Sequence, residues 1–279
     1  IGMNRPHAPT FAPDEYFDLF PIEEVKLAII KDGDTEDCAD ILVPPGADAS
    51  ALGFRRYENY IRQGGTELLR KWTQAYLANI AFVDDQIGKI MDALEAGNYA
   101  DNTWVIFTSD HGYHMGEKEY LFKNSLWEES CRVPFIVTGP GVPEGKICDQ
   151  PISLVDLYPT LIDIAGLNTD FVTPQKLDGY SIVPLLKNPE HGQWRGPDAA
   201  LTSIHSLERL DSGEPGIPER QHYSLRTRKY RYIFCNNGEE ELYDHESDPY
   251  EWNNLADDPD YATIKEELKA EMIAFFKKK

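Results

Sequence analysis

The residues best suited to chemistry follow a run of apolar and β-branched side chains. Asp110, His111 and Gly112 come directly after residues 103–109, a run typical of a strand buried on both faces in a parallel sheet. Open α/β sheets bind ligands at the carboxyl ends of their strands. A carboxylate and an imidazole there can ligate a divalent metal, and Gly112 permits the sharp turn that aims both at one point. The alternative, that Asp110 caps a turn and His111 lies on the surface, stays open on these residues alone.

The loop that follows adds a cation. Lys123 stands in an apolar setting formed by Leu121, Phe122, Leu126 and Trp127. Its ammonium could hold an anionic group beside the metal. The same sequence is equally typical of a lysine whose side chain only extends from an apolar loop into water. His7, between Pro6 and Pro9, is a candidate donor or general acid, or simply a loop histidine. His114 is a secondary candidate.

The elements that must position these residues follow from hydrophobic periodicity. Apolar residues recur at helical spacing over residues 69–94, which predicts a long amphipathic helix. Residues 133–138 read as a second buried strand, and residues 153–166 as a helix with Leu154, Leu157, Leu161 and Ile164 on one face. Helix, strand, loop, strand and helix in this order predict α/β organisation.

The pattern changes after about residue 195. Short strands are predicted at residues 199–204, 221–227, 230–236 and 240–243, with a hairpin turn at residues 236–238, and a closing helix is predicted over residues 261–277. We therefore predict an α/β part over residues 1–195 and a small antiparallel sheet with a closing helix over residues 196–279. Arg226, Arg228 and Arg231 in these strands read as surface arginines, with contact to a substrate carboxylate as the alternative.

Composition limits the partners. The formal net charge is −21, and without a basic stripe the chain is not expected to bind nucleic acid. An anionic substrate is repelled at long range, so an anion site must be a local cationic pocket. No apolar run is long enough to span a bilayer. The chain opens on Ile1 without a signal peptide, which predicts a processed or truncated chain.

Several motifs together resemble a known family. Residues 107–117 read Phe-Thr-Ser-Asp-His-Gly-Tyr-His-Met-Gly-Glu, and Lys123 and then Arg-Val-Pro-Phe-Ile-Val at residues 132–137 follow. They resemble the type I sulfatases, formylglycine-dependent enzymes of the alkaline phosphatase superfamily, and within them most the iduronate-2-sulfatase group. Further segments match in the same order, at residues 5–9, 74–84, 153–160 and 241–255, so the resemblance covers nearly the whole chain.

The resemblance implies an alkaline-phosphatase-like α/β fold: a mostly parallel sheet, incomplete N-terminally, followed by a small antiparallel sheet with a C-terminal helix. It implies hydrolysis of a sulfate ester, with a sulfated sugar, such as a glycosaminoglycan fragment, as substrate. Asp110 and His111 would ligate Ca²⁺, Lys123 would contact the sulfate, and His7 would contact the reacting ester, with His114 also at the substrate. Calcium rests on the family, because an imidazole ligand by itself would suggest a transition metal.

One expected motif is absent. Sulfatases use a Cys or Ser in Cys/Ser-x-Pro-x-Arg, oxidised to formylglycine, as nucleophile, and the nearest candidate, Cys131-Arg-Val-Pro134, has its proline one position late. The paired aspartates that complete the metal site are also not found. We therefore predict that these residues belong to an N-terminal part of the same protein outside this chain, and that the chain alone is inactive.

Two alternatives remain. One is a phosphodiesterase or phosphonate monoester hydrolase of the same superfamily, which would hold two transition metals; the other is a catalytically inactive fragment. For the sulfatase itself we expect a bacterial protein that is periplasmic or secreted.

Overall fold

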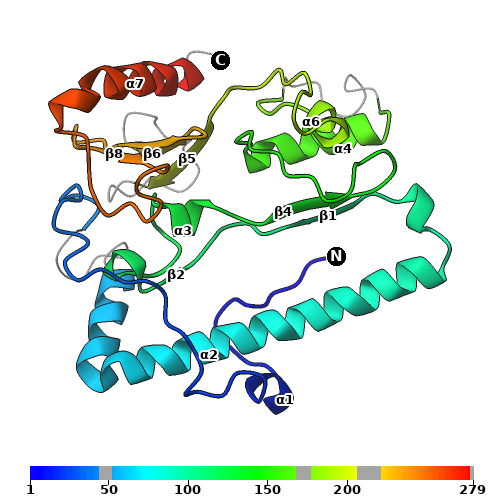
Figure 1. Cartoon of the computed structure of the whole chain (residues 1–279), viewed down its shortest axis with the longest axis horizontal. Coiled ribbons are helices and arrows are strands. Elements are labelled where there is room, and N and C mark those ends of the chain that lie inside the picture. The colour runs from blue at the N-terminus through cyan, green and yellow to red at the C-terminus, as the bar shows by residue number, and fades with distance from the viewer. Residues whose placement is uncertain (44–51, 168–176, 206–220, 277–279) are drawn as a thin grey trace, which may run out of the picture. The chain divides into compact units, whose positions relative to one another are not determined.

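A computed structural model of the chain describes residues 1–43, 52–167, 177–205 and 221–276 (Figure 1). The chain divides into two compact units that alternate along the sequence. Unit 1 comprises Ile1–Glu36, Pro45–Thr103 and Tyr113–Lys123, and unit 2 comprises Asp37–Pro44, Trp104–Gly112 and Asn124–Lys279. These units follow spatial compactness rather than chain order, so the predicted domain boundary after residue 195 stays a prediction.

Unit 1 is built along the long helix α2 (Leu52–Ala96). The helix predicted over residues 69–94 is confirmed, and it begins earlier than its apolar pattern indicated. Gly65 interrupts it with φ 56° and ψ −148°, four residues before the predicted stretch begins. The apolar stripe is only partly covered, because Leu69 is fully buried whereas Ile80 is 42% exposed.

The N-terminal segment of unit 1 runs along α2. Its short helix α1 (Asp14–Phe17) is tied to α2 by the Tyr16 hydroxyl, which donates to Asp85 Oδ2 at 2.8 Å. Further along, Gln74 Nε2 donates to the carbonyl oxygen of Phe20 at 2.7 Å. The segment therefore travels antiparallel to α2, and side chains of the helix satisfy its backbone.

A small hairpin completes unit 1. Strands β2 (His114–Met115) and β3 (Leu121–Phe122) pair antiparallel around the turn η2 (Glu117–Glu119). Aromatic contacts fasten the hairpin to α2, through the rings of Trp72, Tyr76, Tyr113 and Phe122. After α2, the short helix η1 (Ala100–Asn102) leads out of the unit.

The two predicted core strands of unit 2 pair with each other. β1 (Val105–Thr108) and β4 (Phe135–Thr138) form an antiparallel ribbon. We expected both to be buried in a mostly parallel sheet, but within the described residues they have no other strand partner, and Ile136 is 62% exposed and Phe107 38% exposed. The apolar pattern reports which side chains are suited to burial; it encodes neither the direction of a neighbouring strand nor what covers it.

In the part of the chain that the structure describes, three short helices follow the ribbon: η3 (Leu154–Asp156), α4 (Leu157–Ile164) and α6 (Val183–Lys187). A capping box between Ser153 and Asp156 begins the first of them. The predicted apolar face is wrong in part, because Leu154 and Leu161 are 38% and 45% exposed, whereas Thr160 and Ile162 are buried. Thr160 is paired through its hydroxyl, which donates to Asp156 O at 2.6 Å and accepts from Ile182 N–H.

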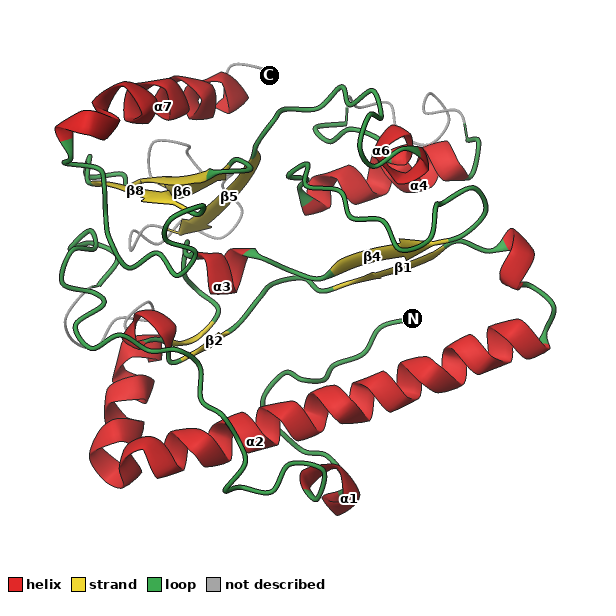
Figure 2. Ribbon diagram, in the orientation of Figure 1, coloured by secondary structure: helices red, strands yellow, loops and turns green. Residues whose placement is uncertain are grey.

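The C-terminal part of unit 2 is the predicted antiparallel sheet with its closing helix (Figure 2). Its strand order is sequential, β5-β6-β7-β8, and the helix α7 (Ala262–Phe276) follows a turn of 3-10 helix, η5 (Pro259–Tyr261). The predicted last helical residue, Lys277, lies outside the described residues. The strands are β5 (Ala200–His205), β6 (Gln221–Arg226), β7 (Tyr230–Phe234) and β8 (Glu240–Asp244).

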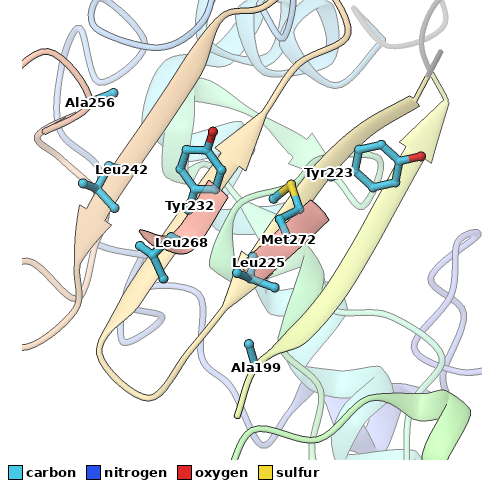
Figure 3. Packing of buried hydrophobic residues seen from close by; sticks show 8 residues of the cluster. All are labelled: Ala199, Tyr223, Leu225, Tyr232, Leu242, Ala256, Leu268 and Met272. Atoms are coloured by element: carbon cyan, nitrogen blue, oxygen red, sulfur yellow. The ribbon is translucent and has the colours of Figure 1, made fainter. Parts of the chain in front are cut away.

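Alternation along the strands gives this sheet two different faces. One face carries the hydrophobic core against α7 (Figure 3), formed by Ala199, Tyr223, Leu225, Tyr232, Leu242, Ala256, Leu268 and Met272. The opposite face carries Ser224, Arg231 and Glu241, which are also buried. Burying polar side chains requires hydrogen-bond partners, so this second face must hold a polar network. None of the helices in the described ranges is both long and apolar enough to cross a membrane.

Candidate active site

Asp110 and His111 form a turn directly after β1. His111 Nε2 lies 3.6 Å from Asp110 Oδ2, and the other ring nitrogen, Nδ1, lies 2.8 Å from the carbonyl oxygen of Gly112. A proton on Nδ1 donates to that carbonyl and leaves the lone pair of Nε2 beside the carboxylate. The Asp110 side chain is 86% exposed and that of His111 28%, so neither side chain is fully buried.

This geometry fits a divalent cation. Metal-ligating histidines usually donate their second nitrogen to a carbonyl or carboxylate, which fixes the tautomer and the ring, and His111 has that arrangement with Gly112 O. One carboxylate and one imidazole are fewer ligands than zinc or calcium takes. The described turn can therefore hold part of a metal site, and the remaining ligands must come from other residues.

A glycine is required at position 112 because neighbouring backbone atoms leave no room for a Cβ atom, and not because the residue has a left-handed backbone conformation. Its N–H donates to Ser130 O at 2.8 Å, and a Cβ atom at this position would lie 2.0 Å from Glu129 O. Both carbonyls belong to the short helix α3 (Glu128–Cys131). The turn that carries the two candidate ligands is thus fixed against α3.

Lys123 and His114 belong to the hairpin of unit 1. Lys123 is half-buried and directly follows β3. His114 is fully buried, with Nδ1 3.1 Å from Glu117 O and its ring edge-on to Tyr120 at 5.4 Å. The hairpin orients both residues, and their predicted contacts with a substrate stay predictions.

His7 lies in the exposed N-terminal segment of the same unit. Its Nδ1 is 2.6 Å from Ala8 O, and the Arg5 guanidinium donates to His7 O at 3.3 Å and to Phe11 O at 3.1 Å. Side chains of the segment therefore contact its own backbone carbonyls. Of the five predicted site residues, Asp110 and His111 lie side by side in unit 2, and His7, His114 and Lys123 lie in unit 1.

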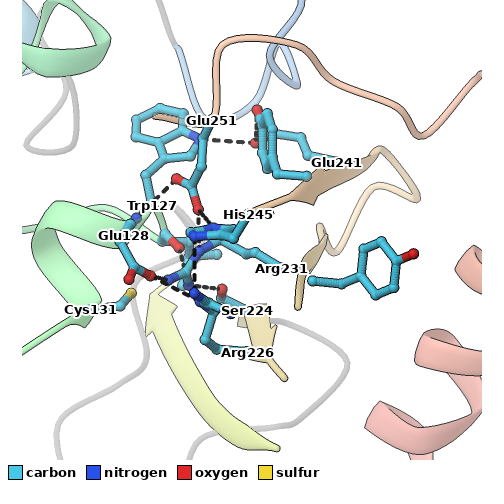
Figure 4. A network of polar contacts seen from close by, with 12 residues as sticks. Trp127, Glu128, Cys131, Ser224, Arg226, Arg231, Glu241, His245 and Glu251 are labelled. Atoms are coloured by element: carbon cyan, nitrogen blue, oxygen red, sulfur yellow. Dashed lines mark hydrogen bonds and ion pairs between the residues drawn. The ribbon is translucent and has the colours of Figure 1, made fainter. Parts of the chain in front are cut away.

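Sequence reasoning missed a buried ion network on the second face of the C-terminal sheet (Figure 4). Arg231, predicted as a surface arginine, is 1% exposed. Its guanidinium donates to Glu251, to Glu128 and to Ser224 Oγ. The signal was an arginine inside a strand of otherwise buried residues, but its partners lie far away in the sequence.

Arg226 and His245 complete this network. Arg226 Nε donates to Glu128 Oε2 at 3.1 Å, and its Nη2 lies 2.9 Å from His245 Nδ1. Because Arg226 can only donate, His245 Nδ1 accepts, and His245 Nε2 then carries the proton that it donates to Glu251 Oε1 at 2.8 Å. Two guanidinium groups thus balance two carboxylates around a neutral imidazole.

The carboxylates in the network are held ionised by their partners. Burial alone would raise the pKa of Glu251, but the guanidinium of Arg231, together with His245, lowers it to about 2. Burial likewise opposes ionisation of Glu128, and Arg231 and Arg226 lower its pKa below the usual range. Candidate donor atoms of Glu128, His245 and Glu251 lie within 4.8 Å of one another, but each of the three residues already interacts with Arg226 or Arg231. We interpret this group as an ion network and not as a metal site.

Comparison with known proteins defines the class. Residues 1–167 match the family described as Sulfatase, and residues 116–278 match N-sulphoglucosamine sulphohydrolase, C-terminal. A solved phosphonate monoester hydrolase of Agrobacterium radiobacter is 27% identical with a TM-score of 0.75, over 97% of this chain and 55% of that one. The fold is therefore alkaline-phosphatase-like, as predicted.

Sulfatases are also among the similar proteins. A sulfatase of Formosa agariphila is 32% identical over 97% of this chain and 48% of its own length. A structure solved in complex with its substrate D-glucosamine-2-N,6-O-disulfate is 27% identical with a TM-score of 0.67, over 80% of this chain and 45% of that one. The chain belongs to the sulfatase family, and it spans about half the length of the curated relatives that it matches.

Proposed function

We propose that this chain supplies part of the active site of a sulfuric ester hydrolase whose formylglycine nucleophile lies outside it. The observation that carries the proposal is the turn after β1, where His111 Nε2 lies 3.6 Å from Asp110 Oδ2 and His111 Nδ1 is engaged by the carbonyl oxygen of Gly112. Membership of the sulfatase family supports it. The whole protein, meaning this chain with the N-terminal part proposed below, is the enzyme.

The roles follow from the chemistry of each residue. Asp110 and His111 would hold a metal that supplies Lewis-acid stabilisation of negative charge on the sulfuryl group. The ammonium of Lys123 would bind a sulfate oxygen, and His7 and His114 would orient the ester. His7 would also donate a proton to the leaving oxygen. For the metal we propose Ca²⁺ on the resemblance to sulfatases, although an imidazole ligand is unusual for that ion.

For the substrate we propose a sulfated sugar. The resemblance of residues 107–117 and 5–9 to the iduronate-2-sulfatase group supports this, and so does the similar structure that holds D-glucosamine-2-N,6-O-disulfate. We also propose a periplasmic or secreted bacterial enzyme, and the similarity to a bacterial sulfatase supports the bacterial source.

We also propose an N-terminal part of the same protein as partner. The exposed apolar pair Phe107 and Ile136 on the ribbon supports it, because an apolar strand face of this kind is normally covered. The nucleophile and further metal ligands would come from that part.

The alternative function is hydrolysis of a phosphonate monoester or a phosphodiester, and the similarity to the phosphonate monoester hydrolase favours it. The test is to measure metal content and kcat/KM of the whole protein for 4-nitrophenyl sulfate and for bis(4-nitrophenyl) phosphate. We expect one Ca²⁺ and a preference for the sulfate ester. Two transition metals with a phosphodiester preference would establish the alternative.

A variant tests the assignment of Lys123. We expect Lys123→Ala to lower kcat/KM for the aryl sulfate by about 10²-fold or more, the scale for loss of one transition-state contact. Lys146→Ala, in an exposed ion pair with Glu190, is the matched control and should leave kcat/KM unchanged. A fully inactive, correctly folded and metal-loaded whole protein would instead support the inactive fragment.

A further inference from the structure

We propose that the buried ion network of the C-terminal sheet positions the metal-binding turn, acting through α3. In this proposal, which rests on the proposed function of Asp110 and His111, the network residues Glu128, Arg231 and Glu251 are positioning residues. They contact neither the metal nor the substrate. All of these residues belong to unit 2, so one compact body contains the whole connection.

The first step is the hold of the network on α3. Glu128 is the first residue of α3, and its carboxylate accepts from both Arg226 and Arg231. Its backbone N–H donates to Glu251 Oε2 at 2.9 Å. Arg231 Nη1 also donates to Leu126 O at 3.0 Å. The sheet therefore fixes the start of α3 through side-chain and backbone groups together.

The second step is the hold of α3 on the turn. Ser130 O accepts from the Gly112 N–H at 2.8 Å, and the Gly112 Cα lies so close to α3 that an added Cβ would meet Glu129 O at 2.0 Å and Arg132 O at 2.6 Å. Gly112 O in turn accepts a hydrogen bond from His111 Nδ1 at 2.8 Å. A shift of α3 would therefore move the carbonyl that sets the orientation of the His111 ring.

The network is suited to hold a position rather than to add stability. Buried ion pairs often contribute no more to folding than apolar residues of the same volume would, but removing one partner leaves an unpaired buried charge. Arg231 is 1% exposed and Glu251 2%, so neither can turn to water. Glu128 consequently has one well-defined position, and this fixes the position of α3.

The test measures Ca²⁺ affinity of the whole protein by calorimetric titration, with folding checked by circular dichroism. Glu128→Gln keeps the shape of the side chain and removes its charge. We expect it to weaken Ca²⁺ binding by roughly 10- to 100-fold, the effect typical of residues that orient metal ligands. Gly112→Ala leaves the network intact but separates the turn from α3, and it should weaken binding by a similar factor.

The matched control lies on the other face of the same sheet. Glu240 on β8 accepts from Tyr232 and pairs with Lys265 and Lys269. Glu240→Gln therefore also removes a paired carboxylate, but these contacts do not connect it to α3 or to the metal-binding turn. It should change Ca²⁺ affinity less than twofold. If Glu128→Gln does not fold, Ser224→Ala, which removes one hydrogen bond to Arg231, should still give a severalfold loss.

Hydrogen exchange provides the second measurement. Residues 108–113 should exchange faster in Glu128→Gln than in wild type and not in Glu240→Gln. The inference is overturned if Glu128→Gln and Gly112→Ala bind Ca²⁺ like wild type while Asp110→Asn has lost it. If Asp110→Asn also binds Ca²⁺ like wild type, the proposed metal site itself is wrong.

Discussion

Glu251 shows how a single buried residue couples stability to pH. Its pKa is about 2 in the folded chain, below the usual value of 4.5. A carboxylate with a lowered folded-state pKa contributes stability that is present above its unfolded pKa and is lost as the pH falls. We expect the free energy of unfolding of the whole protein to decrease as the pH falls from about 4.5 to 2, measured by urea denaturation.

The variant Glu251→Gln isolates this effect. At pH 7 it should destabilise the protein by roughly 3 kcal/mol, because Arg231 loses a buried partner, and the loss of stability between pH 4.5 and 2 should become smaller. Glu190→Gln, in the exposed pair with Lys146, should cost less than about 1 kcal/mol. Equal pH dependence in wild type and Glu251→Gln would contradict the assignment.

At the residue scale, the sequence indicated the chemistry of neighbouring residues but not which residues far apart in the sequence form ion pairs. The position of Asp110 and His111 after a strand was predictable because the strand, the turn and both candidate ligands are contiguous in the sequence. The burial of Arg231 was not, since its partner Glu128 is 103 residues away. A charge balance between distant residues leaves no periodic signal in the sequence.

At the scale of elements, the turn between β7 and β8 offers a direct test of backbone conformation. Gly238 has φ 92°, and a Cβ there would meet no atom within 4 Å. Gly238→Ala should therefore cost roughly 1–2 kcal/mol from backbone strain alone, measured as the urea midpoint. Gly88→Ala in α2, also in open space, is the control and should stabilise the protein slightly, because alanine favours a helix. Equal shifts in both variants would contradict this reading.

The hairpin that ends at Lys123 offers a second test. Lys118 and Asp34 form an ion pair at 3.1 Å, both side chains 2% exposed, and Thr35 Oγ1 donates to Glu119 Oε2 at 3.0 Å. Burial raises the pKa of Asp34, while Lys118 opposes that rise. Asp34→Asn should destabilise the protein by roughly 3 kcal/mol and speed hydrogen exchange of residues 114–123, because it removes the carboxylate that pairs with the buried ammonium of Lys118.

A compensating variant separates charge from packing at the same hairpin. Asp34→Asn combined with Lys118→Met removes both charges and should recover most of the lost stability. If the double variant is no more stable than Asp34→Asn, the destabilisation does not come from the loss of the ion pair.

The elements themselves were largely predictable, since the strands after residue 195 and α7 follow from the hydrophobic period and the turn residues. The antiparallel pairing of β1 with β4 was not, because strand direction has no period.

At the scale of the whole molecule, the exposed ribbon bears on the proposed N-terminal partner. Phe107 and Ile136 lie directly opposite each other in the β1–β4 register, so their side chains share one face. They are 38% and 62% exposed. If the N-terminal part covers this face, it buries both side chains, and covering an isoleucine contributes about 1.5–3 kcal/mol.

Placing a charge on that face tests whether the partner covers it. We expect the chain, co-expressed with a tagged N-terminal part, to be retained with it, and Ile136→Asp to weaken the association at least 10-fold because a carboxylate would be buried without a partner. Ile147→Asp is the matched control: Ile147 is 82% exposed and lies outside the ribbon, so its substitution should leave the association unchanged. Equal retention of both variants would mean that the N-terminal part does not pack on this face, and the nucleophile would then have to reach Asp110 and His111 from another side.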